Sequence, residues 1–184
     1  MKYIFFILAI AGLQRAIAQT PEIYPVAGRQ CPDFYLSDVR FYPEKHVSLA
    51  DFKGKWLVLD FWNRYCQTCL AAMPSTDSLQ KEFSGRVQFL LVGYTGSRYT
   101  HHSDDKAIHQ LYPQLRKRLN IDLPVAYDSL LFHRFDIGSC PYMVVIDPAG
   151  VVRAVTIGLN KQNMKDMMAN KPVVLRKAVN RKGF

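Results

Sequence analysis

The sequence lacks internal repeats, low-complexity stretches and any apolar run long enough to be a confident membrane span. It is also poor in cysteine, since four cysteines in 184 residues are few for the disulfide framework of an exported domain. No nucleic-acid-binding motif accompanies its net charge of +9. The length suits one domain with a substantial core and is too short for two ordinary ones. These absences favour a single globular domain whose cysteines have a redox function and do not form a structural disulfide framework.

The N-terminus has the features of a secretory signal peptide. Lys2 gives the positive start and residues 3–13 form an apolar run. Ala16 and Ala18 place small residues at the two positions that signal peptidase needs, so we predict cleavage between Ala18 and Gln19. No cysteine follows this site directly, so a lipidated N-terminus is not expected.

This cleavage site sets the predicted domain organisation. Residues 1–18 are the signal peptide, 19–27 an extended lead-in, 28–170 the folded domain and 171–184 a basic C-terminal tail. The protein is then exported, and we expect it in the periplasm. The alternative is an uncleaved membrane anchor through residues 3–18, although that run is short for a span.

Much of the positive charge lies in the C-terminal tail. Removal of Lys2 and Arg15 with the signal lowers the net charge from +9 to +7, and the basic residues of 171–184 meet no acid there. Such a tail could contact anionic lipid headgroups or acidic partners. We interpret it instead as a solvated, partly frayed terminus, and we expect no nucleic-acid partner.

Strand and helix patterns alternate along the chain and predict an α/β fold. The near-continuous apolar run 56–62 is typical of a strand that is buried on both faces of a sheet. The predicted order is β-α-β-α-β-β-α with an added N-terminal β-hairpin, which gives a central mixed β-sheet flanked by helices. The predicted strands are 33–36, 47–49, 56–62, 87–94, 123–127, 142–146 and 151–157. The predicted helices are 65–83 with a break signal at Pro74, 104 or 105–119, a short one capped by Asp128, and 161–169.

The sequence Cys66-Gln67-Thr68-Cys69 stands where the buried strand ends and a helix begins. Thiol–disulfide exchange needs one thiolate that attacks and a second thiol nearby that releases the mixed disulfide. The first turn of a helix lowers the pKa of the first thiol, so Cys66 is the expected nucleophile and the more buried Cys69 the resolving thiol. Half of a zinc site is the alternative, but no second Cys-x-x-Cys or paired histidine follows at ligand spacing.

The segment 61–69, followed by Met73-Pro74, resembles the active site of the thioredoxin superfamily, and most closely its exported TlpA/ResA-like branch. Further similarities are Cys31-Pro32-Asp33-Phe34 and the segments 49–54 and 146–150. The resemblance implies a thioredoxin-like fold and a thiol–disulfide oxidoreductase whose substrates are protein thiols and disulfides. It favours reduction of exported proteins, with re-reduction of the Cys66/Cys69 disulfide by a membrane electron donor. We expect a monomer without cofactor or bound metal.

The resemblance also implies roles for residues outside the motif. Pro74 matches the proline that kinks the active-site helix, and Pro141 matches a cis proline that faces the disulfide. The Cys140–Pro141 edge would then bind a substrate strand through its backbone. Asp60 stands where thioredoxin has a buried acid that takes the proton of the resolving thiol, although a structural acid bonded to a backbone N–H is the alternative.

Two aromatic residues are expected beside the site, and two further positions differ from the motif of the family. Trp62 and Tyr65 are expected to border the active site and contact substrate. Ala72 stands where the TlpA/ResA-like branch usually has an acid, so a role in cytochrome c maturation is in doubt. Thr68 replaces the usual proline of the motif, which leaves the direction of the reaction open.

Two cysteines lie outside the motif. Cys140 could form alternative disulfides with the redox pair, but a small buried residue is the simpler interpretation. Cys31 is expected in the core, and a Cys31–Cys140 pair cannot be deduced from the sequence.

Two other functions compete with the oxidoreductase. A thiol peroxidase of the peroxiredoxin type needs a threonine and a proline where this chain has Asn63 and Leu59. A metal-carrying binding module, similar to the copper-binding Sco-like proteins, would use the chain's scattered histidines, but the Cys-x-x-x-Cys spacing of those proteins is absent. These histidines are His101, His102, His109 and His133, and we interpret them as solvated.

Overall fold

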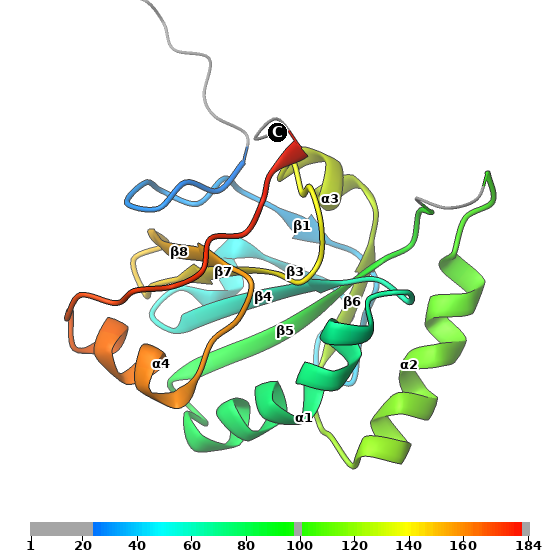
Figure 1. The fold of residues 1–184 in the computed structure, drawn as a ribbon, viewed down its shortest axis with the longest axis horizontal. Helices are drawn as coiled ribbons and strands as arrows, with labels where there is room; N and C mark the ends of the chain where they lie inside the picture. Colours follow the sequence, from blue (N-terminus) through cyan, green and yellow to red (C-terminus); the bar gives the residue numbers. More distant parts are fainter. Residues whose placement is uncertain (1–23, 98–100, 182–184) are drawn as a thin grey trace, which may run out of the picture.

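The computed structural model of the chain describes residues 24–97 and 101–181. At its centre lies a six-stranded mixed sheet in the order β2-β6-β5-β4-β7-β8 (Figure 1). Strands β4, β5 and β6 run parallel, whereas β2, β7 and β8 are antiparallel to their neighbours. The bounds are β2 (Val39–Arg40), β4 (Trp56–Trp62), β5 (Val87–Tyr94), β6 (Val125–Asp128), β7 (Tyr142–Ile146) and β8 (Val152–Thr156). The predicted α/β fold with a central mixed sheet is confirmed.

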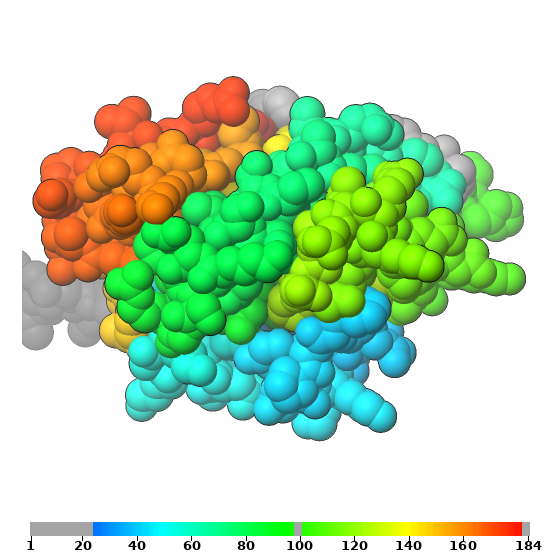
Figure 2. Space-filling model, turned by 90° about the horizontal axis from the view of Figure 1, so that it is seen from below, coloured from blue at the N-terminus to red at the C-terminus, as the bar shows by residue number. Residues whose placement is uncertain are grey.

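Helices α1, α2 and α4 cover one face of this sheet, and Figure 2 shows α1 and α2 side by side on that face. A two-stranded antiparallel sheet, the short helix η1 and helix α3 cover the other face (Figure 1). The helices are α1 (Gln67–Glu82), α2 (Asp105–Leu119), α3 (Leu130–Arg134), α4 (Lys161–Met168) and η1 (Leu49–Phe52), and the small sheet pairs β1 (Tyr35–Leu36) with β3 (Val47–Ser48). This small sheet is the N-terminal hairpin expected from the sequence.

Strand β4 divides its side chains between the two cores. Trp56, Val58 and Trp62 join the cluster beneath α1, α2 and α4, whereas Leu57 and Phe61 join the cluster on the opposite face. Successive side chains of a strand point to opposite faces, so a strand covered on both faces has no polar alternation. The burial of β4 on both faces explains why residues 56–62 form a near-continuous apolar run.

Three local features differ from the sequence-based expectation. The predicted loop between the first two strands contains the edge strand β2, which pairs with β6. Helix α1 begins at Gln67 rather than near Tyr65, because Cys66 caps it. Pro74 does not break α1, which continues to Glu82. Strand β2 has only two residues, too few to show the alternation of apolar and polar residues that marks a strand in the sequence. It can be recognised only from its pairing with β6.

The expectation of a frayed C-terminal tail is wrong for residues 176–181, whose backbone pairs with the rest of the fold. Lys177 pairs with Thr156 of β8, and Asn180 pairs with Ile137. An edge strand leaves one row of backbone groups without sheet partners, and this segment supplies partners for them. The predicted signal peptide with its cleavage site at Ala18 lies outside the described residues. Within them, no helix combines the length and the apolar character needed to cross a membrane.

Candidate active site

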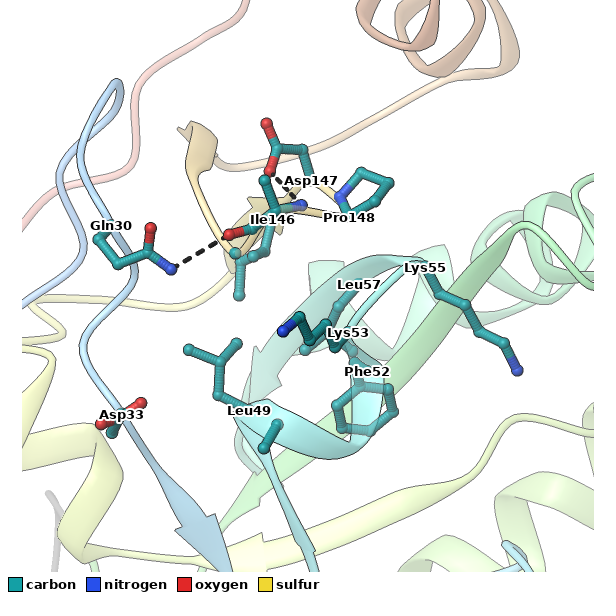
Figure 3. A pocket seen from close by; sticks show the side chains of 13 residues that line it. Gln30, Asp33, Leu49, Phe52, Lys53, Lys55, Leu57, Ile146, Asp147 and Pro148 are labelled. Atoms are coloured by element: carbon teal, nitrogen blue, oxygen red, sulfur yellow. Dashed lines mark hydrogen bonds between the residues drawn. The ribbon is translucent and has the colours of Figure 1, made fainter.

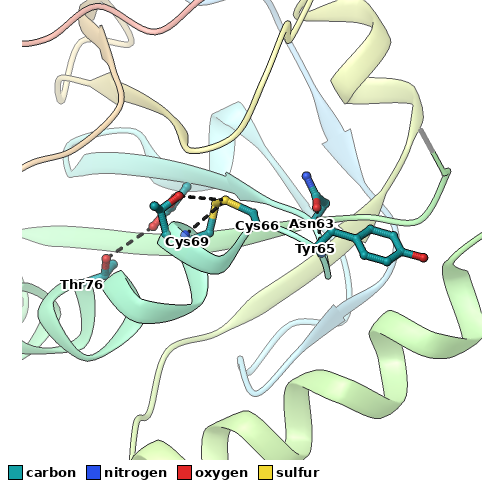
Figure 4. The surroundings of a disulfide bond; sticks show 7 residues. Asn63, Tyr65, Cys66, Cys69 and Thr76 are labelled. Carbon is teal, nitrogen blue, oxygen red and sulfur yellow. Dashed lines mark hydrogen bonds between the residues drawn. A yellow bond between two sulfur atoms is a disulfide. The ribbon is translucent and has the colours of Figure 1, made fainter. Parts of the chain in front are cut away.

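The cysteine motif lies at the C-terminal end of β4. The turn after Trp62 is closed by Asn63, whose side-chain oxygen accepts a hydrogen bond from the Tyr65 N–H at 2.9 Å (Figure 4). The Asn63 carbonyl accepts a second bond from the Cys66 N–H at 3.1 Å. These two bonds bring the chain directly from the strand into α1, so Cys66 stands at the start of the helix.

Cys66 is the N-terminal capping residue of α1. Its Sγ accepts a hydrogen bond from the Cys69 N–H at 3.2 Å and lies 3.4 Å from the Thr68 hydroxyl (Figure 4). The first turn of a helix has N–H groups without carbonyl partners, and the helix dipole is positive there. Both features stabilise a thiolate on reduced Cys66.

Cys66 and Cys69 form a disulfide with an S–S distance of 2.04 Å (Figure 4). Cys66 is half-buried, whereas Cys69 is only 5% exposed. An external disulfide or thiol therefore meets Cys66 first. This difference in exposure supports the roles that the sequence predicts for the two sulfurs.

Asp60 is a buried acid on the face of β4 that α1 covers. It is 6% exposed, and its carboxylate accepts a hydrogen bond from the Thr76 hydroxyl at 3.4 Å. Burial disfavours the charged form and raises the pKa of Asp60 to about 7, while the hydrogen bond from Thr76 acts in the opposite direction. A carboxyl group with this pKa can accept and return a proton near neutral pH.

The two aromatic residues of the site differ in accessibility. Trp62 is 1% exposed and packs against Tyr112 of α2, with 5.9 Å between the ring centroids. Tyr65 is 37% exposed and lies in the active-site turn. Trp62 therefore supports the site from below and offers almost no surface to a substrate, contrary to the expectation that it borders the site as Tyr65 does.

Sequence reasoning missed Arg64 and Asp104 as residues of the site. The Arg64 guanidinium donates to the Tyr65 hydroxyl at 2.6 Å and lies 3.2 Å from the carboxylate of the buried Asp104. Arg64 and Tyr65 border a surface hollow of about 320 Å³ between the active-site turn and α2. Its lining residues are Arg64, Tyr65, Ala107, Gln110, Leu111 and Gln114. Arg64 and Asp104 are far apart in the sequence, and the sequence pattern placed Asp104 only at the start of a predicted helix.

The peptide bond between Cys140 and Pro141 is cis, as the resemblance implied. Pro141 directly precedes β7, whose first residue, Tyr142, pairs with Phe61 of β4. The antiparallel register thus places Cys140 and Pro141 beside the end of β4, where the active-site turn begins. Cys140 and Cys66 pack against the same buried cluster, which contains Cys69.

Cys31 belongs to the core on the opposite face of the sheet. It is 3% exposed, and burial together with nearby Asp33 raises the pKa of its thiol to about 12. Cys31 and Cys140 both carry thiols, so the Cys31–Cys140 disulfide considered from the sequence is not formed. Cys31 packs as a core residue, away from the redox pair.

His109 and His133 contact separate partners and do not gather into one cluster. His109 Nε2 lies 2.8 Å from the Asp38 carboxylate, and its ring stacks on Tyr127 with 3.7 Å between centroids. His133 Nδ1 lies 2.9 Å from the Arg181 guanidinium. Across residues 24–97 and 101–181, no group of three or more His, Cys, Asp or Glu side chains could hold a metal ion.

A second hollow, of about 280 Å³, lies at the far end of β4 (Figure 3). It is lined by Leu57 at the start of β4 and Ile146 at the end of β7, and so lies away from the disulfide. The segments 49–54 and 146–150, which carry part of the sequence resemblance, line it. The Gly54 N–H donates to the Pro148 carbonyl at 3.0 Å, which indicates that these segments serve the fold rather than the redox site.

Comparisons with known proteins agree with this geometry. The AhpC/TSA family matches residues 27–155. The chain is 27% identical to the thioredoxin-like protein YneN of Bacillus subtilis over 143 residues, covering 77% of this chain and 78% of that protein. It is also 27% identical to the thiol-disulfide oxidoreductase ResA of Bacillus subtilis over 145 residues, covering 77% and 73%. The solved structure of the exposed lipoprotein thioredoxin Etrx1 of Streptococcus pneumoniae superposes with a TM-score of 0.60 at 26% identity, covering 75% of this chain and 98% of Etrx1. The predicted resemblance to thioredoxin-like oxidoreductases is confirmed.

Proposed function

The chain belongs to the AhpC/TSA family and is a thiol–disulfide oxidoreductase, and we propose that it reduces disulfides of exported proteins. The observation that carries the proposal is the arrangement of the two sulfurs. Half-buried Cys66 caps α1 and buried Cys69 lies one turn behind it, bonded to it. One sulfur is thus accessible and activated, and the other is held ready to displace a partner from it.

The reaction begins with the reduced pair. The Cys66 thiolate attacks one sulfur of a substrate disulfide, forming a mixed disulfide and releasing the other substrate sulfur as a thiolate, which takes up a proton. Cys69 then loses its proton and attacks the Cys66 sulfur. The second substrate thiolate leaves, and the Cys66–Cys69 disulfide forms, so two electrons have passed from the enzyme to the substrate.

We assign the proton acceptor for Cys69 to Asp60. Its burial and its pKa of about 7 suit a group that takes a proton near neutral pH. It lies on the side of β4 that faces α1, the helix that carries Cys69. Ala72 stands where the TlpA/ResA-like branch usually has an acid, so the chain has no carboxylate at that position.

The substrate strand is expected to bind at the Cys140–Pro141 edge, with Tyr65 on the other side of the disulfide. The register of β7 against β4 and the exposure of Tyr65 support this docking site. Backbone groups of a strand can then pair with the substrate chain regardless of its sequence. Trp62 would act only indirectly, by supporting the turn.

The cellular setting is also part of the proposal. Export with cleavage between Ala18 and Gln19 would place the enzyme in the periplasm, as a monomer, where a membrane electron donor re-reduces the Cys66–Cys69 disulfide. The sequence features of residues 1–18 support export, as does the likeness to an exposed lipoprotein thioredoxin. Residues 3–18 would serve as an anchor if cleavage did not occur.

Trapping of mixed disulfides tests the function. Cys69→Ser leaves the nucleophile without its resolving partner, so it should accumulate disulfide-linked adducts through Cys66. Cys66→Ser should accumulate few, and Cys31→Ala, which changes a buried thiol on the other face, should behave as the wild type. If neither active-site variant captures a thiol partner and the wild type binds copper or zinc tightly, the chain is a metal-carrying module instead.

A further inference from the structure

Residues 176–181 lie along the edge strand β8 and then along the loop that leads to Cys140 and Pro141. In Figure 1 they belong to the red segment that runs from α4 past β8 and β7 to α3. The segment follows residue 155, where the AhpC/TSA family match ends. The segment itself therefore lies outside the family match, whereas residues 136–142, to which it binds, lie within it.

The first half of the segment binds β8 and the residue after it. The Arg176 carbonyl accepts hydrogen bonds from the Ile157 N–H at 3.1 Å and from the Thr156 hydroxyl at 2.7 Å. The Ala178 N–H donates to the Val155 carbonyl at 3.4 Å. These bonds fix the segment on the outer edge of the sheet, which is a rigid support.

The second half binds three consecutive residues of the loop before Cys140. The Gly138 N–H donates to the Val179 carbonyl at 2.9 Å, and the Arg181 N–H donates to the Asp136 carbonyl at 2.9 Å. The Arg181 Nε donates to the Ile137 carbonyl at 3.1 Å. The loop is thus held through its backbone on the N-terminal side of the Cys140–Pro141 edge.

Gly138 permits this close contact. A Cβ atom at this position would lie 2.4 Å from the Val179 carbonyl oxygen and 2.8 Å from the Asn180 carbonyl carbon. Real Cβ atoms do not approach backbone atoms so closely, so any side chain here displaces the segment. Gly158, close to the same segment, has no heavy atom within 4 Å of its Cβ position and provides a matched control.

Asn180 holds the chain on the C-terminal side of the edge. Its side-chain oxygen accepts a hydrogen bond from the Tyr142 hydroxyl at 2.8 Å. Tyr142 is fully buried and packs edge-on against Phe61 of β4, with 6.0 Å between the ring centroids. Residues 138 and 142, on either side of Cys140 and Pro141, are therefore both bound to the same segment.

We propose that residues 176–181 form a brace that positions the Cys140–Pro141 edge beside Cys66 for binding of a protein substrate. Asn180 and Arg181 are then positioning residues, and neither touches the reacting sulfurs. The inference rests on the proposed function, because it assigns the substrate strand to the Cys140–Pro141 edge.

The physical reason is the entropy of the loop. A loop that is ordered before the substrate arrives costs less conformational entropy on binding than one that must become ordered with it. Loss of the brace should therefore weaken binding of a protein substrate. It should leave the reactivity of Cys66 toward a small reagent unchanged, since α1 and its capping bond do not involve the segment.

The experiment uses the full-length variants Gly138→Ala and Asn180→Ala, with Gly158→Ala as the control for the glycine change. Asn180→Asp keeps the oxygen that accepts the Tyr142 hydrogen bond and is the conservative rescue. Dithiothreitol-driven reduction of insulin gives kcat and KM. The rate of iodoacetamide alkylation of the reduced protein, followed by mass spectrometry on the peptide that contains Cys66, reports on that thiol separately from the partly exposed Cys140. Thermal unfolding confirms that each variant is folded at the assay temperature.

For Gly138→Ala and Asn180→Ala we expect a rise in KM of about tenfold with unchanged kcat and alkylation rate. Gly158→Ala and Asn180→Asp should keep the wild-type KM. Unchanged KM in both brace variants, or an equal fall in the alkylation rate, would overturn the brace while leaving the proposed function intact. A wild-type protein that does not reduce insulin would overturn the proposed function itself, and the brace with it.

Discussion

The Asp60 carboxylate accepts a hydrogen bond from the Thr76 hydroxyl at 3.4 Å, and this bond joins β4 to α1 on the buried side of the redox centre. Thr76 lies two helical turns after Cys69, on the same face of α1. The contact therefore connects the assigned proton acceptor to the helix that carries both sulfurs. Asp60 and Thr76 each give a prediction that can be tested separately.

Replacement of Asp60 by asparagine should remove a pH dependence of stability. The folded pKa of about 7 lies above the ordinary aspartate value, so between the two values the native state binds more protons than the unfolded state. The free energy of unfolding of the wild type should then fall by about 1 kcal/mol per pH unit between about pH 4 and about pH 7. Asp60→Asn should lack this decline, as measured by urea unfolding. Asp122→Asn, which changes an exposed carboxylate, should keep it, and a decline retained in Asp60→Asn would contradict the assignment.

Replacement of Thr76 by valine should raise the pKa of Asp60 further. The hydroxyl stabilises the charged carboxylate, and valine keeps the shape of the side chain without the donor. Titration of the Asp60 side-chain carboxyl carbon by NMR measures the change. An unchanged pKa would show that burial alone sets the value, and a lower pKa would contradict the stabilisation of the carboxylate by Thr76.

The two thiols outside the disulfide should differ in reactivity. Cys31 is buried and burial raises its pKa to about 12, whereas Cys140 is partly exposed. Iodoacetamide should therefore label Cys140 in the oxidised native protein and leave Cys31 unmodified, as read by mass spectrometry. Both should be labelled after denaturation, which is the control. Labelling of native Cys31 would mean that this core opens more readily than its burial indicates.

Replacement of Cys140 by alanine should leave the redox equilibrium of the Cys66–Cys69 disulfide unchanged. The structure bonds Cys66 to Cys69, and Cys140 contributes a small side chain to the packing on both sides of the sheet. Equilibration with glutathione measures the potential of the pair in wild type and variant. A shift in the equilibrium constant of about tenfold, or a Cys66–Cys140 disulfide in the wild type, would instead make Cys140 a third redox thiol.

Rapid peroxide turnover is not expected, even though the chain belongs to the AhpC/TSA family. The positions that a peroxidatic site needs for threonine and proline are occupied by Asn63 and Leu59. Asn63 uses its side-chain oxygen to close the active-site turn, and Leu59 is buried in the core. A hydrogen peroxide consumption assay of the reduced protein should show only slow oxidation. Fast catalytic turnover would favour the peroxidase over the disulfide reductase.

Much of the redox centre could be predicted from the sequence because its physics is local. A buried strand, a helix start and two cysteines three residues apart fix which sulfur faces the solvent, since the first turn of any helix offers N–H groups to the residue that caps it. The apolar run of β4 likewise predicted a strand that is buried on both faces of the sheet. Cys66 and Cys69 and their roles as nucleophile and resolving thiol could therefore be predicted without tertiary information.

Residues joined by long-range contacts could not be found in this way. The ion pair of Arg64 with Asp104, the edge strand β2 and the burial of Trp62 under α2 all depend on which segments the fold brings together. The C-terminal segment gave the clearest error, because its composition is that of a solvated tail. Only the unpaired edge of β8 and the small size of Gly138 explain why it is bound.

The sequence by itself determined the chemistry, since spacing and helix position place the two thiols and set which one reacts. The tertiary structure decided what surrounds them: the pKa of Asp60 follows from burial between β4 and α1, and the placing of Cys140 and Pro141 follows from the pairing of β7 with β4. The reason for the division is distance along the chain. Capping acts within one helical turn, whereas burial and strand pairing exist only after distant segments have packed together.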